Sequence, residues 1–173
     1  MKRVMFLAWG ALLLSTLAAE RAGAAMTKVE LKNAQGESVG TATLEARPDG
    51  VKVILQAAKL APGQHGLHIH AVGKCAPPDF TSAGSHFNPQ GKHHGLENPA
   101  GSHAGDLPDL VVGPDGTATA EILATHVSLE STGANSLFQP EGTALVIHAN
   151  PDDQKTDPAG NAGARIACGV ITK

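Results

Sequence analysis

The sequence has few of the side chains that commonly bind nucleic acids. It contains no tyrosine, and its single tryptophan, Trp9, lies in an apolar N-terminal segment. The whole chain has 13 basic and 16 acidic residues. Without the N-terminal segment, which holds Lys2, Arg3, Arg21 and Glu20, 10 basic and 15 acidic residues remain, and the net charge moves from −3 to −5. Aromatic stacking platforms are therefore absent, and an acidic chain is a poor partner for nucleic acid or an anionic membrane surface.

The sequence has only one long apolar run, at its N-terminus. The run covers residues 4–19, follows two basic residues, and precedes small side chains at residues 22–24. A membrane-spanning helix needs about 20 apolar residues, and this run is shorter. The layout predicts a cleaved signal peptide over residues 1–25 and a single domain over residues 26–173. We expect the mature protein to have no membrane anchor and to work in the periplasm or as a secreted protein.

Cysteine is scarce as well. Cys75 and Cys168 are the only two in the chain. In an exported protein, one intramolecular disulfide is the simplest use of two cysteines. Closing a loop of about 90 residues in this way would stabilise the fold by roughly 4–5 kcal/mol in the chain-entropy model.

Helical periodicity is hard to find in the mature chain. Short alternating segments recur instead, separated by turn sequences such as Pro48-Asp49-Gly50. Strands are predicted over residues 27–34, 39–46, 50–57, 65–71, 109–112, 117–124, 143–149 and 165–171. Eight short strands with such turns predict an all-β fold, either an antiparallel sandwich or a barrel.

Two segments depart from this strand pattern. Residues 72–108 are rich in Gly, Pro and His without apolar alternation, and residues 150–164 are polar and rich in Gly and Pro. Loops longer than about 12–15 residues are usually functional or disordered. Because the first segment holds Cys75, Asp106 and several histidines, we predict a functional loop that is ordered by metal and by the disulfide.

Histidine, in contrast, is abundant and clustered. Seven of the nine histidines lie between residues 65 and 103. Neutral imidazole is the commonest protein ligand for transition metals. His68 and His70 lie in the predicted strand 65–71, where side chains two residues apart point to the same face. They could therefore bind one ion from a rigid element.

The residue types in and around this cluster suit two kinds of metal site. Three imidazoles with one carboxylate suit tetrahedral zinc, and several imidazoles in a tetragonal arrangement suit copper(II). The further candidates are His86, His94, His103, Asp106 and His148. A solvated loop histidine is the ordinary alternative for each residue taken singly, but not for seven together. A zinc hydrolase is disfavoured, because no H-E-x-x-H motif is present and four zinc ligands leave no open position.

Several segments together resemble the copper/zinc superoxide dismutases. They are His68-Ile69-His70, Gly84-Ser85-His86-Phe87-Asn88-Pro89, His94-Gly95, His103-Ala104-Gly105-Asp106 and Gly160-Asn161-Ala162-Gly163-Ala164-Arg165-Ile166-Ala167-Cys168-Gly169-Val170-Ile171. The resemblance covers essentially the whole mature chain, in the family's order and near its spacing. It implies an eight-stranded antiparallel Greek-key sandwich or barrel, immunoglobulin-like, with two long functional loops. It also implies a disulfide between the two cysteines.

Carried over position by position, the resemblance implies one copper and one zinc ion per subunit. The implied copper ligands are His68, His70, His86 and His148; the implied zinc ligands are His86, His94, His103 and Asp106. The ring of His86 would then bridge the two ions. His93 is the rival for His94, which is favoured by its spacing from His86 and by the glycine that follows it.

The resemblance also implies a role for a carboxylate outside the ligand set. Asp152 lies four residues after His148, as does an aspartate of the family that links a copper ligand to a zinc ligand by hydrogen bonds. Here the linked residues would be His68 and His94, whose ring orientations such a partner fixes. The alternative is a solvated loop acid, as expected for the adjacent Asp153.

The implied activity is that of an enzyme, a superoxide dismutase that converts two superoxide anions into O2 and H2O2. Copper would cycle between Cu(II) and Cu(I), whereas zinc has no redox chemistry. Arg165 would guide and bind the anionic substrate, and His86 would donate a proton. His65 matches a structural histidine, and His126 matches no functional position. We expect a homodimer. The alternative is a copper or zinc binding or delivery protein, which needs the same imidazoles but no arginine beside an open copper face.

Overall fold

The computed structural model describes residues 25–173, so the predicted signal peptide lies almost wholly outside the described residues. It contains nine strands: β1 (Met26–Asn33), β2 (Ser38–Arg47), β3 (Gly50–Ala57), β4 (Gly63–His65), β5 (Leu67–His70), β6 (Leu110–Val112), β7 (Ala118–Ala124), β8 (Thr143–His148) and β9 (Arg165–Ile171). A single 3-10 turn, η1 (Thr81–Ala83), interrupts the loop after β5. Among the described residues, no helix is long and apolar enough to cross a membrane.

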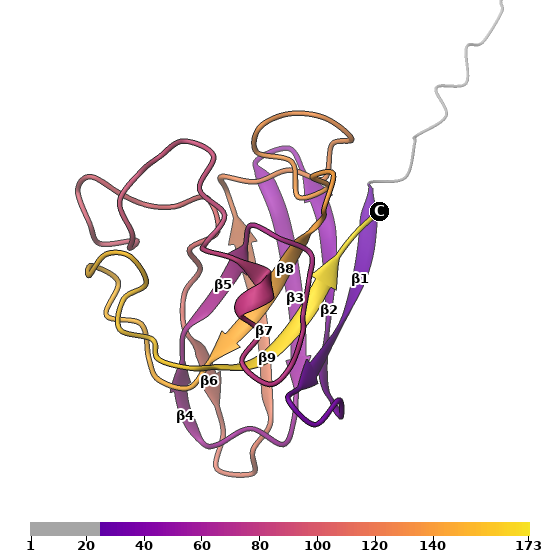
Figure 1. Cartoon of the computed structure of the whole chain (residues 1–173), viewed down its shortest axis with the longest axis vertical. Coiled ribbons are helices and arrows are strands. Elements are labelled where there is room, and N and C mark those ends of the chain that lie inside the picture. The colour runs from indigo at the N-terminus through magenta and orange to yellow at the C-terminus, as the bar shows by residue number, and fades with distance from the viewer. Residues whose placement is uncertain (1–24) are drawn as a thin grey trace, which may run out of the picture.

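The strands form a curled antiparallel sheet (Figure 1). Seven of them follow the order β5-β8-β9-β1-β2-β3-β7, and β4 pairs with β6 in a second, two-stranded sheet. The order inserts the C-terminal strands β8 and β9 between β5 and β1, so strands distant in sequence become neighbours, as in a Greek key. The prediction of an all-β antiparallel Greek-key fold is confirmed.

One predicted strand differs, because residues 65–71 form two strands rather than one. The break falls at Gly66, where the pairing partner changes from β6 to β8. The Gly66 amide donates to the Asn150 carbonyl at 2.8 Å, and its carbonyl accepts the His148 amide at 2.8 Å. A Cβ at Gly66 would lie 2.8 Å from the Cβ of Ala162, so a larger residue could not approach this closely. The chain thus turns a corner between the two sheets without a connecting loop.

Strand β5 is buried on both faces, although apolar residues and histidines alternate along it. Leu67 and Ile69 belong to the main hydrophobic core. His68 and His70 alternate with them and therefore point to the opposite face, where they are fully buried and bridge to Asp106 and His86 of the long loop after β5. Imidazoles on a rigid strand are therefore shielded from water by a loop that carries further histidines.

Two long loops lie beside β5, as predicted. Residues 71–109 connect β5 to β6, and residues 149–164 connect β8 to β9. They approach each other closely, since the Glu97 amide of the first donates to the Gln154 carbonyl of the second at 3.1 Å. A third connection, residues 125–142, was not singled out in the sequence, and it buries Leu129 and Leu137 in the core. These two leucines anchor the connection to the core.

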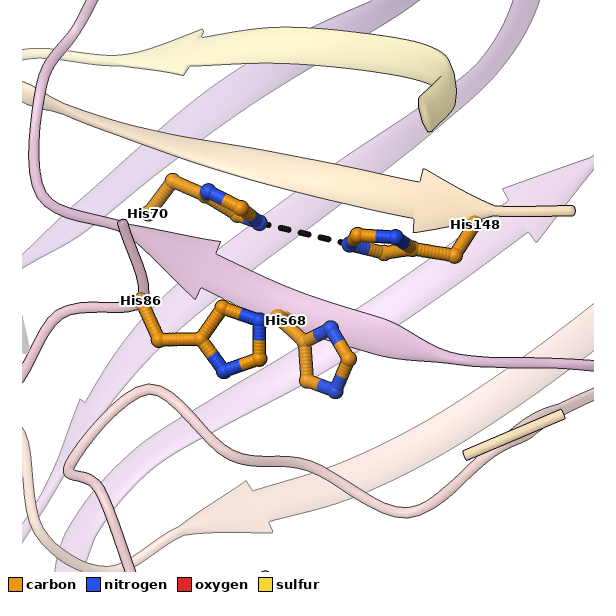
Figure 2. A group of neighbouring side chains, drawn as sticks. All are labelled: His68, His70, His86 and His148. Atoms are coloured by element: carbon orange, nitrogen blue, oxygen red, sulfur yellow. Dashed lines mark hydrogen bonds between the residues drawn. The ribbon is translucent and has the colours of Figure 1, made fainter. Parts of the chain in front are cut away.

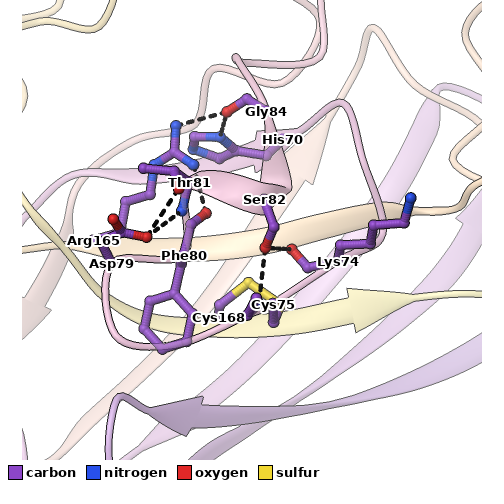
Figure 3. Close-up of a disulfide and its surroundings, with 11 residues drawn as sticks. His70, Lys74, Cys75, Asp79, Phe80, Thr81, Ser82, Gly84, Arg165 and Cys168 are labelled. Atoms are coloured by element: carbon purple, nitrogen blue, oxygen red, sulfur yellow. Dashed lines mark hydrogen bonds between the residues drawn. A yellow bond between two sulfur atoms is a disulfide. The ribbon is translucent and has the colours of Figure 1, made fainter.

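The predicted disulfide is present. Cys75, in the first long loop, is bonded to Cys168 in β9 across 93 residues of sequence, with the two Cα atoms 5.7 Å apart (Figure 3). A small apolar cluster of Phe80, Ala83, Ala144, Val146 and Cys168 packs around it. The bond therefore fixes the loop onto the sheet face that carries the histidines.

Candidate metal centre

Four histidines from two strands and one loop converge on the covered face of the sheet. His68 and His70 come from β5, His148 ends the neighbouring strand β8, and His86 comes from the first long loop (Figure 2). All four are buried, and their candidate ligand atoms lie within 4.8 Å of one another. This group contains the four residues that the sequence assigned to copper.

Hydrogen bonds on the outer ring nitrogens orient two of these imidazoles. His70 Nδ1 lies 2.9 Å from the Gly84 carbonyl, and His148 Nδ1 lies 3.2 Å from the Gly163 carbonyl. A ring that donates through Nδ1 keeps a lone pair on Nε2. The two Nε2 atoms face each other at 3.3 Å (Figure 2). Both rings thus present acceptor nitrogens to the same small space.

The other two imidazoles have buried nitrogens without partners. Within the described residues, His68 Nδ1 and His86 Nε2 make no hydrogen bond, although both atoms are inaccessible to solvent. Buried polar atoms are nearly always paired, and unpaired ones indicate a missing partner such as an ion. A cation bound by imidazole nitrogens would satisfy all four residues, so the donor set fits copper.

A second cluster surrounds one oxygen of Asp106. His86 Nδ1 lies 2.9 Å from Asp106 Oδ1, His94 Nδ1 lies 3.0 Å from it, and His103 Nδ1 lies 3.4 Å from it. The other oxygen, Oδ2, accepts the amide hydrogens of Gly95 and His103 at 2.8 and 2.9 Å. Three imidazole nitrogens and one carboxylate oxygen are thus gathered in the combination that suits tetrahedral zinc.

His68 also lies near this second cluster. Its candidate ligand atom is within 4.8 Å of those of His86, His94 and Asp106, so distance alone would admit it to the group. Its Nε2 is taken, however, by Asp152 Oδ2 at 2.6 Å. His103, which the sequence assigned to this site, has its Nδ1 3.5 Å from His86 Nδ1. Distance therefore leaves two candidates for the fourth member, His68 through its free Nδ1 and His103.

His86 belongs to both clusters through different nitrogens. Its Nδ1 faces Asp106, and its Nε2 is the unpaired atom beside the β5 histidines. The ring centroids of His68 and His86 are 3.9 Å apart. One imidazole thus connects the two sites.

Asp152 makes the two hydrogen bonds that the sequence led us to expect. Its Oδ2 lies 2.6 Å from His68 Nε2, and its Oδ1 lies 3.0 Å from His94 Nε2. The close packing depends on Gly160, for which the sequence predicted no role. A Cβ there would lie 1.7 Å from Asp152 Oδ1, and its φ of +58° also favours glycine. The positive φ and the close contact with Asp152 together require a glycine at this position.

The adjacent histidines 93 and 94 point in opposite directions. His94 is fully buried between Asp106 and Asp152. The side chain of His93 is 62% exposed, and its Nδ1 forms a short contact with a carboxylate oxygen of Asp157. Asp157 also accepts the His94 amide at 2.5 Å. The geometry brings His94, not His93, to the metal cluster.

Burial keeps three of the four clustered histidines, His68, His70 and His148, neutral. Desolvation lowers the pKa of His68 to about 4, that of His70 to about 2 and that of His148 to about 3. Imidazole binds a metal only in its neutral form. These three residues therefore need not lose a proton before they bind an ion at neutral pH.

The carboxylates of the centre are ionised. Burial alone would raise the pKa of Asp106 and Asp152, but their hydrogen bonds with histidines outweigh it and hold both values well below the usual range. For His94, burial by itself would lower the pKa, because it disfavours the charged imidazole. The hydrogen bonds to the same two carboxylates outweigh this effect and raise the pKa to about 9. Without a metal, His94 is therefore protonated at neutral pH and offsets part of the charge of the two carboxylates, and it must lose a proton before it binds an ion.

Arg165 lies next to the copper-side histidines, which are His68, His70, His86 and His148. Its Nη1 donates to the Phe80 carbonyl at 2.6 Å, and its Nη2 donates to the Gly84 carbonyl at 2.6 Å (Figure 3). Gly84 is also the acceptor for His70. The guanidinium and the His70 ring are therefore bonded to the same carbonyl oxygen. Arg165 is only partly buried.

Two histidines lie outside both clusters. His65 is buried, with one ring nitrogen 2.8 Å from the His148 carbonyl and the other 2.8 Å from the Ala61 carbonyl. His126 is exposed. These positions agree with a structural role for the first and no metal-site role for the second.

Known proteins have similar sequences and a similar arrangement of strands. The family model described as copper/zinc superoxide dismutase (SODC) matches residues 38–171. "Superoxide dismutase [Cu-Zn] 1" of Aquifex aeolicus (strain VF5) is 47% identical over 168 residues, which are 96% of this chain and 99% of that protein.

Solved structures agree with the sequence comparison. A SOD-like protein from Bacillus subtilis superposes with a TM-score of 0.82 at 41% identity, covering 85% of this chain and 99% of that one. The Cu/Zn superoxide dismutase from Brucella abortus gives a TM-score of 0.71 at 34% identity, covering 85% and 99%. Because the family model matches most of the chain, the chain belongs to the copper/zinc superoxide dismutase family.

Proposed function

We propose that the two histidine clusters hold one copper and one zinc ion that share His86. Copper would be bound by His68, His70, His86 and His148, and zinc by His86, His94, His103 and Asp106. The observation that carries this assignment is the pair of unpartnered buried nitrogens, His68 Nδ1 and His86 Nε2. Asp152 supports it by holding the far nitrogens of His68 and His94, which orients both rings.

The activity is the conversion of two superoxide anions and two protons into O2 and H2O2. Bound copper supplies the one-electron redox change, and zinc supplies a fixed positive charge without redox chemistry. Arg165 attracts the anion and donates hydrogen bonds to it, because its guanidinium keeps its charge at all relevant pH values. Whenever its Nε2 is not bound to copper, His86 could hold a proton at that atom and pass it to the reduced substrate.

A copper or zinc delivery protein would need the same imidazoles. It would have no use for a guanidinium that two backbone carbonyls hold beside His70. The position of Arg165 therefore favours the dismutase over the delivery protein.

Superoxide consumption by the purified, metal-loaded protein tests the function. We expect rapid dismutation from protein that contains both metals and none from the metal-free protein. Protein that binds both metals and consumes no superoxide would contradict the enzyme assignment and favour metal delivery.

We further propose that residues 1–25 are removed on export and that the mature protein is a homodimer outside the cytoplasm. The disulfide supports export, because such bonds persist in oxidising compartments. Mass spectrometry of protein from a periplasmic extract should find a chain that begins near Met26. Light scattering should give twice the mass of one chain. Retention of residues 1–25, or a monomer at micromolar concentration, would contradict the corresponding part.

A further inference from the structure

Arg165 lines an open pocket of about 430 Å³ that also contains an acidic residue. The lining residues are Pro78, Asp79, Thr81, Gly163, Ala164 and Arg165. Gly163 supplies the carbonyl that orients His148, and the Arg165 guanidinium shares the Gly84 carbonyl with His70. The pocket therefore adjoins the copper-side histidines and is where an anionic substrate would meet the guanidinium.

Asp79 is fixed at the rim of this pocket. Its Oδ1 accepts the Thr81 amide at 3.0 Å and the Thr81 hydroxyl at 2.9 Å. The side chain is exposed, and Figure 3 shows it beside the Arg165 side chain. Among the described residues, the hydrogen bonds of the guanidinium go to backbone carbonyls and none goes to Asp79. The carboxylate thus stays a separate negative charge near the cation.

Asp79 is ionised at neutral pH. The hydrogen bonds from Thr81 hold the pKa of its carboxyl below the usual range, and the charge of Arg165 adds to this effect. An anion that enters the pocket therefore meets one fixed positive and one fixed negative charge. Because the mature chain is acidic overall, these local charges decide whether the anion is attracted.

We propose that Asp79 restrains the entry of anions to the pocket and so sets how strongly Arg165 attracts superoxide. The inference rests on the proposed function and adds a specificity-determining residue to it. A carboxylate repels an approaching anion through water, and salt screens that repulsion. Its removal should therefore speed the reaction at low ionic strength and have no effect at high ionic strength.

The variant Asp79→Asn tests this directly, because asparagine keeps the Oδ1 acceptor for Thr81 and loses the charge. We expect the second-order rate constant for superoxide to rise about two- to fourfold at 10 mM salt, as for one charge about 5–10 Å from the anion's path. The difference should vanish near 1 M salt, where the Debye length is about 3 Å. Asp79→Glu keeps the charge and should retain the salt dependence of the parent protein.

Asp115 offers a matched control. Its Oδ1 accepts the Thr117 amide at 3.0 Å and the Thr117 hydroxyl at 2.8 Å, in the same Asp-x-Thr arrangement. It is exposed and lies in the turn between β6 and β7, outside the pocket. Asp115→Asn removes the same charge from the molecule and should leave the rate constant unchanged.

Azide binding to the copper-loaded protein gives a readout without turnover. The copper absorption band that azide induces should titrate at about two- to fourfold lower azide concentration in Asp79→Asn than in the parent. An unchanged rate constant together with unchanged azide affinity in Asp79→Asn would overturn the proposal. So would an equal gain in Asp115→Asn, since the effect would then come from net charge. If the protein has no dismutase activity, the azide titration still decides the role of Asp79.

Discussion

At the scale of single residues, the orientation of each imidazole is set by the hydrogen bond on its other ring nitrogen. His70 and His148 each face a backbone carbonyl through Nδ1, so their Nε2 atoms point into the cluster. His68 is reversed, because Asp152 holds its Nε2. One carboxylate and two carbonyls therefore determine which nitrogen of each ring is free for a metal.

Replacing His148 by alanine should separate the two metal sites. His148 contacts the copper-side imidazoles, whereas none of the short distances around Asp106 involves it. We expect superoxide consumption to fall to background and copper content to fall well below one per chain, with zinc retained. Metal analysis by mass spectrometry checks this, and His126→Ala, at an exposed position, serves as the control. Loss of zinc along with copper would count against separate ligand sets.

Replacing His93 and His94 one at a time should affect zinc very differently. His94 is buried between two carboxylates, whereas the side chain of His93 is 62% exposed. We expect His94→Ala to lose zinc at nanomolar free metal and His93→Ala to keep nearly all of it. A competition titration with a chelator measures both affinities. Zinc loss only in the His93 variant would reverse the assignment.

The residue scale also separates what the sequence could and could not predict. The shared face of His68 and His70 follows from the period of a strand. The remaining ligands were candidates by residue type as well, but their division between copper and zinc came only from the family resemblance, because no periodicity relates positions in a long loop to those in a strand. Histidines 93 and 94 are consecutive in such a loop, so periodicity cannot distinguish them. The family's spacing favoured His94, and in the fold His94 contacts Asp106 whereas His93 contacts Asp157.

At the scale of elements, the two long loops form one unit over the sheet. The second loop supplies Asp152 to the histidines and Asp157 to the backbone of His94. Lys155 in the same loop pairs with Glu97 at 2.7 Å. Residues of the second loop thus hold the metal ligands of the first loop in place. We therefore expect a change in either loop to alter the affinity for both metals.

Replacing Asp152 by asparagine should loosen both metals without removing a ligand. Asparagine cannot accept hydrogen bonds through both side-chain atoms, so either His68 or His94 loses its partner. We expect the affinity for zinc or copper to fall about 10- to 100-fold, the usual effect of losing such a partner. Chelator competition measures this, with Asp153→Asn as the neighbouring exposed control. Equal affinities in the two variants would show that Asp152 is an ordinary loop acid.

Strand positions followed well from the sequence, because alternation of side chains requires only local information. In β3, Val51, Val53 and Leu55 are fully buried while Lys52 and Ile54 are partly exposed. The corner at Gly66 could not be predicted in this way. It depends on contacts with Asn150 and with Ala162, which are distant in sequence.

At the scale of the whole molecule, a disulfide connects the first long loop, residues 71–109, to the sheet. It joins Cys75 to Cys168, three residues from Arg165. The same loop segment supplies the carbonyls of Phe80 and Gly84 that hold the guanidinium. The disulfide therefore contributes both to global stability and to the position of the substrate-binding arginine.

Replacing both cysteines by serine should destabilise the protein and leave its fold unchanged. Removal of a native disulfide typically costs about 2–5 kcal/mol, and this loop spans 93 residues. We expect a lower midpoint in guanidinium unfolding of the metal-loaded protein. A reductant should lower the midpoint of the parent protein and leave the variant unchanged. Equal midpoints for the parent and the variant without reductant would contradict the prediction.

The central claim is that His86 joins a copper site on β5 and β8 to a zinc site around Asp106. Anomalous diffraction from crystals of the metal-loaded protein, recorded at the copper and zinc absorption edges, tests it most directly. We predict a copper peak among His68, His70, His86 and His148, and a zinc peak among His86, His94, His103 and Asp106. A single peak, or zinc bound by His93 or His68 in place of one of these ligands, would contradict the account.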